Sequence, residues 1–186
     1  MIIILFAFII MAFTQQDTEC MALALKLSKL GQNGVGANPM VGCVITNDDK
    51  IVAKDFHHHF GKEHAEINAL NQINHKADNC KVYITLEPCS HQGKTPPCVN
   101  ALISAGIQKV FVATLDPNPL VSGNGVKLLR KNGIEVEVGL LEKDAIEINR
   151  GFIKRMTTGF PFITSKIAMS LDGRVAMKNG ESKWIT

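Results

Sequence analysis

Apolar and polar positions along the chain follow two different periods. Residues 17–30 place apolar side chains at helical spacing, and Gly31 ends the pattern, which predicts an amphipathic helix. A Gly/Asn-rich loop follows over residues 32–39. Two short apolar runs, 41–46 and 51–56, then flank a polar turn. Strand-length runs on either side of a turn are typical of a β-hairpin.

The remaining pattern alternates helices with strands. We expect strands over residues 81–86, 109–114 and 134–138. We expect helices over residues 63–73, 98–105, 125–131 and 142–149. A hairpin followed by alternating helices and strands favours a sheet with helices on both faces, which is a three-layer α/β/α fold. Residues 15–150 would form this domain.

The two ends of the chain differ from this body. Residues 1–13 are all apolar, but they are too few to span a bilayer, which takes about 20 residues. They also lack the basic start and small-residue cleavage site of a secretory signal. Three interpretations of the leader, residues 1–14, stay open: a true start at Met11, a short membrane or signal element, or a segment that packs on the body. We expect no stable membrane span.

Beyond Gly151 the pattern changes again. Residues 160–168 predict a new strand. The segment after residue 158 is too short to bury a core of its own. We therefore expect residues 151–186 to be a linker and the incomplete start of a second α/β domain.

Composition and charge exclude several classes of protein. The 186 residues are 46% hydrophobic and 20% charged, which is typical of a globular chain rather than a disordered one. The net charge of +3, without a clustered basic stripe, argues against a nucleic-acid partner. The odd number of cysteines favours a reducing, cytoplasmic compartment. Cys20, Cys43 and Cys80 have no partner at ligand spacing and are expected to be small buried residues.

Metal-ligand chemistry is concentrated at His64, Cys89 and Cys98. One imidazole and two thiolates make a three-ligand site for one Zn²⁺ per chain, with the fourth position open to water. Zinc lowers the pKa of such a water toward about 7. Glu66 is not needed as a ligand, so it can move a proton from that water to a leaving group. His64 and Cys98 lie near predicted helix starts, whose positive ends favour thiolate over thiol.

The order of these residues is close to a zinc-deaminase signature. That signature reads H-x-E followed by P-C-x-x-C. Here His64-Ala65-Glu66 and Pro88-Cys89 are present, but the second cysteine, Cys98, stands nine positions after the first. The alternative is that the three ligand-type residues are unrelated core or loop residues.

The whole run 85–98, Thr-Leu-Glu-Pro-Cys-Ser-His-Gln-Gly-Lys-Thr-Pro-Pro-Cys, resembles the deaminase domain of the bifunctional riboflavin-biosynthesis deaminase/reductase family. The long spacing between its cysteines is a mark of that family. The resemblance extends from about residue 17 to residue 186, and its other motifs lie at residues 38–42, 116–119, 149–152, 170–174 and 180–186. It implies a cytidine-deaminase-like fold with a mixed sheet. It also implies zinc-dependent hydrolytic deamination of a diaminopyrimidinone ribotide to an aminouracil ribotide and ammonia.

The resemblance also implies roles for individual residues. Asn38 and His57 would face the pyrimidine ring. The ribose phosphate would meet Lys94, Thr95, Asp116 and Asn118. His91 would either touch the ring or brace its loop. Two departures from the family pattern are Ala37, where a proline is usual, and Asp55, where a glycine is common.

Some of these residues also have simpler interpretations. Lys94 can be a solvated loop lysine, and Asp116 and Asn118 can merely build a turn. His58 and His59 are expected to be solvated, because adjacent side chains on a strand point to alternate faces and cannot meet at one ion.

The resemblance places the start of the reductase site at Ala168, Ser182 and Trp184. Ala168 and Trp184 would face the nicotinamide cofactor, and Ser182 the substrate. NADPH is expected only if the complete reductase domain is present, so we expect no reductase activity from this chain. Members of the family often assemble into homo-oligomers, but the sequence does not set their number.

Two other functions remain as alternatives. One is a deaminase acting on a base in nucleic acid, which the weak net charge and the missing basic-aromatic stripe argue against. The other is a non-catalytic zinc module, or a fragment that needs its second domain to fold.

Overall fold

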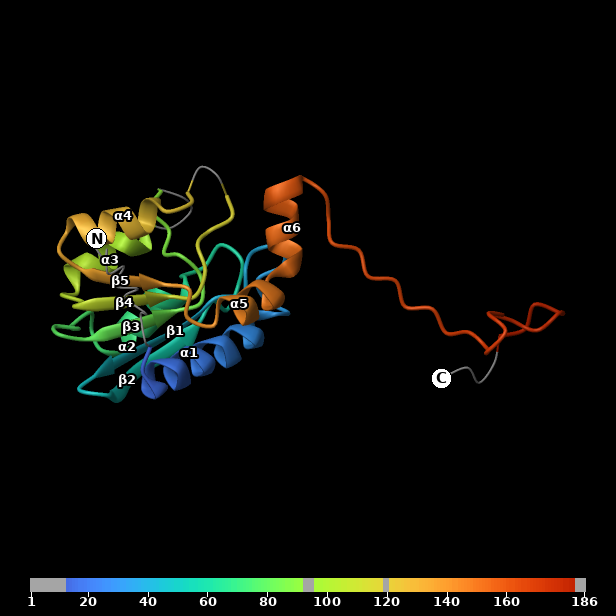
Figure 1. The fold of residues 1–186 in the computed structure, drawn as a ribbon, viewed down its shortest axis with the longest axis horizontal. Helices are drawn as coiled ribbons and strands as arrows, with labels where there is room; N and C mark the ends of the chain where they lie inside the picture. Colours follow the sequence, from blue (N-terminus) through green and yellow to red (C-terminus); the bar gives the residue numbers. More distant parts are fainter. Residues whose placement is uncertain (1–12, 92–95, 119–120, 183–186) are drawn as a thin grey trace, which may run out of the picture.

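A five-stranded sheet forms the centre of the computed structural model, which describes residues 13–91, 96–118 and 121–182. The strand order is β2-β1-β3-β4-β5 (Figure 1). The strands are β1 (Gly42–Asn47), β2 (Lys50–Phe56), β3 (Lys81–Ile84), β4 (Lys109–Val112) and β5 (Glu135–Val138). Strand β1 pairs antiparallel with β2 and β3, whereas β3, β4 and β5 are parallel. The sheet is therefore mixed, as predicted.

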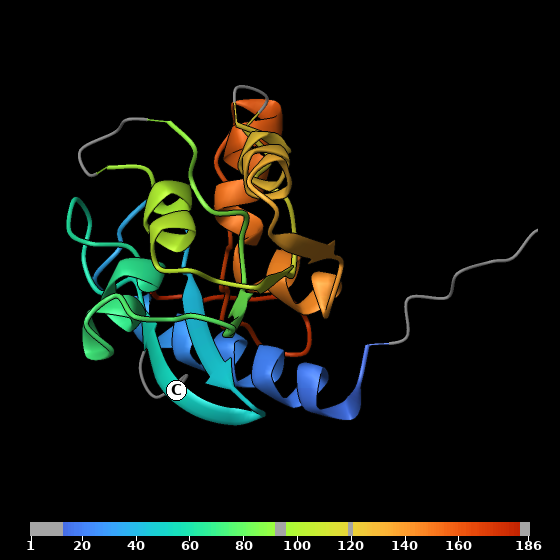
Figure 2. The ribbon, with the colours of Figure 1, turned by 90° about the vertical axis from the view of Figure 1, so that its left-hand side faces the viewer.

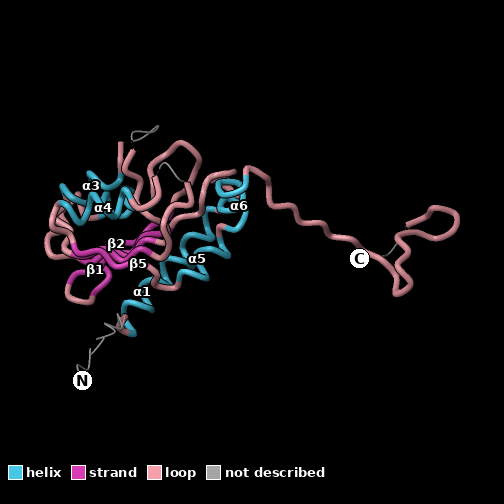
Figure 3. Tube along the Cα trace, turned by 45° about the horizontal axis from the view of Figure 1, so that its top comes forward, coloured by secondary structure: helices cyan, strands magenta, loops and turns pink. Residues whose placement is uncertain are grey.

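Helices cover both faces of this sheet. They are α1 (Gln15–Ser28), α2 (Ala65–Gln72), α3 (Cys98–Ser104), α4 (Asn124–Lys131), α5 (Glu142–Ile148) and α6 (Arg150–Thr158), and a 3-10 turn (Lys29–Gly31) follows α1. Helices α2, α3 and α4 pack on one face, and α1 and α5 on the other (Figures 2 and 3). The predicted three-layer fold is confirmed. Within the described residues, no helix is both long and apolar enough to cross a membrane.

Strand side chains alternate between two hydrophobic cores. Val82 and Ile84 point into the core beneath α2, α3 and α4, whereas Tyr83 between them joins the core beneath α1. The Tyr83 ring stacks on Phe111 of the parallel neighbour β4, with centroids 4.8 Å apart. This alternation follows from the two-residue period of a strand and explains why the central strands are apolar on both faces.

Helix α1 begins at a capping box. The Thr14 hydroxyl accepts a hydrogen bond from the Asp17 N–H, and the Asp17 carboxylate accepts from the Thr14 N–H at 3.0 Å. The hydroxyl of Tyr83 donates to the same carboxylate at 2.8 Å. Phe13 packs on the core beneath α1, so the last two residues grouped with the leader lie on the folded body. The rest of the leader, residues 1–12, lies outside the described residues.

One helix in the C-terminal part was not predicted, and one expected strand there is wrong. Helix α6 lies within the residues expected to form a linker, and its second residue, Gly151, interrupts the helical pattern in the sequence. The strand expected at 160–168 does not form: residues 160–182 contain no helix or strand and run away from the body (Figure 1). A strand needs a neighbour to bond its N–H and C=O groups. No described strand lies beside this segment.

Several expectations about single side chains are confirmed. Cys20, Cys43 and Cys80 are buried and form no disulfide. His58 and His59, next to the buried His57, are exposed. His58 bonds to the Asp55 carboxylate at 2.6 Å instead of turning toward a metal site.

Candidate active site

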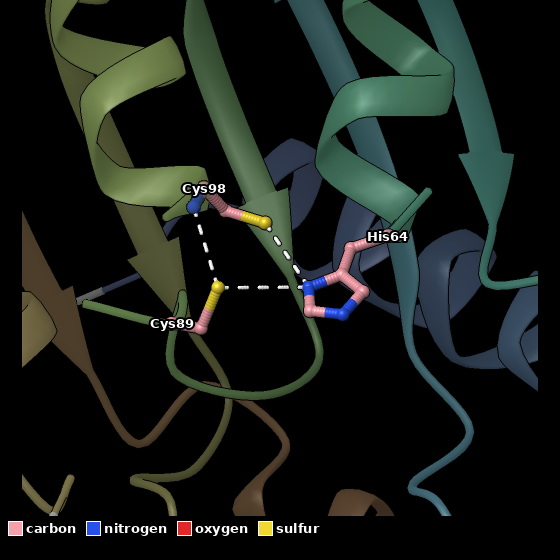
Figure 4. A group of neighbouring side chains, drawn as sticks. All are labelled: His64, Cys89 and Cys98. Carbon is pink, nitrogen blue, oxygen red and sulfur yellow. Dashed lines mark hydrogen bonds between the residues drawn. The ribbon is translucent and has the colours of Figure 1, made fainter. Parts of the chain in front are cut away.

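Three ligand-type side chains meet between α2 and α3. His64 Nδ1 lies 3.2 Å from Cys98 Sγ and 3.6 Å from Cys89 Sγ (Figure 4). His64 is the N-cap residue of α2, and Cys98 is the first residue of α3. Cys89 stands in the loop that follows β3. The structure therefore brings together the residues that the sequence analysis selected, at the two helix starts where it expected them.

The donor atoms fit one zinc ion. In a tetrahedral site with Zn–N of about 2.0 Å and Zn–S of about 2.3 Å, neighbouring donor atoms are roughly 3.6 Å apart. The observed separations of 3.2 and 3.6 Å are close to that value, and all three donor atoms lie within 4.8 Å of one another. Imidazole and thiolate are also the ligand types that zinc prefers.

The electrostatic environment of Cys89 and Cys98 also favours a bound cation. The Cys98 thiol and backbone N–H hydrogen-bond to the Cys89 sulfur and, with His64, lower the pKa of the Cys89 thiol to about 4. A thiolate at Cys89 in turn raises the pKa of Cys98, which is also buried. The close approach of the two sulfurs therefore disfavours ionisation of both thiols together. A divalent ion that prefers sulfur would stabilise both as thiolates.

Glu66 lies in the first turn of α2, beside these ligands. Its side chain is buried, and its carboxyl lies close to Cys98 and His64. Burial raises the pKa of Glu66 to about 7. A carboxyl group with a pKa near neutrality at the wall of a cavity is suited to accept and return a proton.

A cavity of about 290 Å³ opens over His64 and Glu66. Five of the expected substrate contacts line it: Asn38, His57, His91, Asp116 and Asn118. Lys94, Thr95 and Trp184 lie outside the described residues. Ala168 and Ser182 are in the segment without helix or strand and do not line the cavity.

His57 presents an unused hydrogen-bond acceptor. Its Nδ1 donates to the Glu63 carbonyl oxygen at 2.9 Å, because a carbonyl can only accept. Burial lowers the pKa of His57, which favours the neutral ring. Its Nε2 is then an acceptor, and among the described residues it is the buried side-chain polar atom without a partner. A donor on a bound molecule would satisfy it.

Asp116 and Asn118 both build a turn and line the cavity. The Asn118 N–H donates to Asp116 Oδ1 at 2.8 Å, which is an Asx-turn. Burial raises the pKa of the Asp116 carboxyl. The two interpretations of this pair are therefore compatible. His91 is exposed at the edge of the same cavity.

Glu87 is a site residue to which the sequence analysis assigned no role. Its buried carboxylate accepts hydrogen bonds of 2.8–3.2 Å from four backbone N–H groups, those of Asp116, Gly123, Gly125 and Val126. It therefore ties the end of β3 to the start of α4 and to the turn at Asp116. The available signal was a glutamate two residues before a ligand cysteine, but its four partners are 29–39 residues away.

Helix α6 supplies another part of the cavity wall that the sequence analysis missed. Phe152, Arg155 and Met156 line the cavity together with His64 and Glu66. All three lie beyond residue 150, where the deaminase domain was expected to end.

The fold and the His–Cys–Cys site beside a buried glutamate define a zinc-dependent deaminase domain. Residues 14–114 match the family described as the cytidine and deoxycytidylate deaminase zinc-binding region. Residues 161–186 match the RibD C-terminal domain.

Individual relatives narrow this class. The chain is 53% identical to the diaminohydroxyphosphoribosylamino-pyrimidine deaminase of Buchnera aphidicola subsp. Schizaphis graminum, over 78% of this chain and 99% of that protein. It belongs to this family of zinc-dependent deaminases.

Longer relatives extend the same likeness. The chain is 55% identical to the riboflavin biosynthesis protein RibD of Buchnera aphidicola subsp. Baizongia pistaciae, over 92% of this chain and 46% of that protein. It superposes on the Acinetobacter baumannii RibD structure with a TM-score of 0.87 and 50% identity, covering 92% of this chain and 48% of the other. The chain thus spans about half the length of these RibD relatives.

Proposed function

We propose that this chain hydrolyses 2,5-diamino-6-(5-phosphoribosylamino)pyrimidin-4(3H)-one to 5-amino-6-(5-phosphoribosylamino)uracil and ammonia, a step of riboflavin biosynthesis. The observation that carries the proposal is the convergence of His64, Cys89 and Cys98 beside the buried Glu66 at one cavity. The match to a named deaminase over 99% of its length supports the substrate class.

In this mechanism His64, Cys89 and Cys98 hold the zinc ion. When bound, zinc supplies a water of lowered pKa as the nucleophile. Glu66 accepts a proton from the attacking water and passes it to the amino nitrogen, which leaves as ammonia. The second proton of the water ends on the ring nitrogen next to the carbon that gains the carbonyl. The net reaction exchanges one amino group for one oxygen. No oxidant or reductant is needed.

The cavity lining supports several of the proposed substrate contacts. His57 Nε2 accepts a hydrogen bond from a ring or amino N–H, since it has no other buried partner. Asn38 presents an amide that can pair with the amide-like edge of the ring. Asp116 and Asn118 meet the ribose phosphate together with Lys94 and Thr95. His91 stands at the ring or braces its loop.

The C-terminal residues carry a separate proposal. Ala168, Ser182 and Trp184 belong to the start of a reductase site that takes NADPH only within a complete domain. We place the deaminase in the cytoplasm, because its ligand thiols must stay reduced. A homo-oligomer is consistent with this proposal.

The deciding experiment is ammonia release from the ribotide by the purified, zinc-loaded chain, with the uracil product identified by absorbance and mass. Release at one zinc per chain supports the proposal. A folded chain with one bound zinc but no turnover would contradict it and favour the non-catalytic zinc module. Turnover of a single-stranded oligonucleotide in place of the ribotide would favour the nucleic-acid alternative.

A further inference from the structure

Helix α6 lies outside residues 14–114, the stretch that matches the deaminase family, yet it closes part of the deaminase cavity. It stands next to α5 at one end of the sheet (Figure 1). Its residues Phe152, Arg155 and Met156 line the cavity. The cavity is therefore incomplete without this helix.

Two attachments hold α6 to the loop that carries Asn38. The buried Asn149, between α5 and α6, pairs with the backbone of Met40: its Oδ1 accepts from the N–H at 2.8 Å and its Nδ2 donates to the C=O at 2.9 Å. Arg155 Nη2 donates to the Ala37 carbonyl oxygen at 3.1 Å. The two contacts flank Asn38 in sequence. The helix and this loop thus form one unit of the cavity wall.

Arg155 differs in charge from the other ionisable side chains that line the cavity. Among the described lining residues it is the only lysine or arginine, whereas the carboxyl groups of Glu66, Glu87 and Asp116 line the same space. The guanidinium of Arg155 is therefore the permanent positive charge among the described side chains that line the cavity. Within the described chain, Arg155 forms no ion pair with a carboxylate. One of its five N–H groups donates a hydrogen bond to the Ala37 carbonyl oxygen. Its other donors can therefore reach a ligand.

We propose, on the basis of the proposed function, that Arg155 is a specificity-determining residue that binds the phosphate of the ribotide. A guanidinium can make two parallel hydrogen bonds to phosphate oxygens, which a single ammonium group cannot match in geometry. Asn149 is the positioning residue that keeps α6, and with it Arg155, against the cavity. The working deaminase unit then extends through α6, to residue 158.

The first test compares Arg155→Ala, Arg155→Lys and the unmodified chain on two substrates, the ribotide and its phosphate-free riboside. For the ribotide, Arg155→Ala raises KM by about 10- to 100-fold, the usual range for a lost charge-assisted hydrogen bond. Arg155→Lys falls between the two. The riboside loses clearly less kcat/KM than the ribotide, because it loses only the effect of the Ala37 contact. Lys154→Ala is the matched control: it removes a charge from the same helix, but Lys154 does not line the cavity.

The second test measures binding of ribose 5-phosphate to the zinc-loaded chain by calorimetry, which needs no turnover. Arg155→Ala weakens this binding at least tenfold, and Lys154→Ala does not. An equal loss of kcat/KM on both substrates would overturn the proposal, since it would mean that Arg155 acts only by bracing Ala37. Equal ribose 5-phosphate affinity of the variant and the unmodified chain, or no binding by either, would also overturn it. If the unmodified chain releases no ammonia, the proposed function fails, but this binding test still decides the role of Arg155.

Discussion

Two buried glutamates line the same cavity in very different surroundings. Glu66 and Glu87 are 3% and 4% exposed. Glu87 accepts four backbone hydrogen bonds, whereas Glu66 lies beside His64 and Cys98, and burial raises the pKa of Glu66 to about 7. Burial alone therefore does not identify a catalytic carboxylate. A carboxylate saturated by backbone donors is fixed in place, and one with a raised pKa can exchange a proton.

The largest effect is expected from Glu66→Gln. Turnover of the ribotide should fall by about 10²- to 10⁴-fold, the usual contribution of a positioned acid/base group. Bound zinc and the urea midpoint should stay unchanged, because the amide has the same shape. The control is Glu63→Gln, the same substitution on an exposed side chain. Retained turnover in Glu66→Gln would contradict the proposal that Glu66, unlike Glu87, transfers a proton in the reaction.

Glu87→Gln should act on stability more than on chemistry. Its amide nitrogen would face backbone N–H groups that need an acceptor, so the free energy of unfolding should fall by about 2–4 kcal/mol. We also expect a higher KM, because the turn at Asp116 loses its anchor, and a nearly unchanged kcat at saturation. Urea unfolding and steady-state kinetics measure these effects. Glu142→Gln, on the exposed start of α5, is the matched control. If Glu87→Gln lowered kcat without lowering the free energy of unfolding, Glu87 would have a chemical role and not the structural role proposed here.

A third carboxylate, Asp17, lies on the other face of the sheet and away from the cavity. Asp17→Ala removes the partner of Thr14 and Tyr83, so it should cost about 2 kcal/mol in the free energy of unfolding. The KM for the ribotide should not change. A shift in KM would mean that the two faces of the sheet are coupled.

The smallest expected effect is the pH dependence of the stability that Asp17 contributes. Burial opposes ionisation of Asp17, but hydrogen bonds from Thr14 and Tyr83 outweigh it and lower the pKa of the carboxyl. The stability that ionised Asp17 contributes is thus fully present above its unfolded pKa of about 3.9 and is lost as the pH falls below that value. The stability gap between the unmodified chain and Asp17→Asn should narrow from pH 5 to pH 3 in urea titrations. A constant gap would contradict this assignment.

Local patterns in the sequence were enough for most of the body. The strands and the helices through α5 form within a few residues of their expected bounds. Their apolar residues recur at helix or strand spacing over short stretches of sequence, so the pattern can be read without knowing the tertiary contacts. The candidate zinc ligands could be selected from the sequence because zinc binds few side-chain types, and the structure brings them together with His64 and Cys98 at helix starts. Helix α6 was missed because Gly151 interrupts its pattern. The strand at 160–168 failed because an apolar run does not supply its own pairing partner.

The sequence by itself determined the residues of the candidate site, namely the His–Cys–Cys group and the glutamate beside it, and the α/β order that holds them. The tertiary structure alone decided two parts of the surroundings: the cavity wall from helix α6, and the backbone groups that hold Glu87 and the Met40 loop. The Met40 backbone and the Asn149 side chain are 109 residues apart, and the donors to Glu87 are contributed by the turn at Asp116 and the start of α4. The physical reason is that every residue except proline carries the same backbone N–H and C=O groups. Only the positions of these groups in the folded chain decide which side chains they bind.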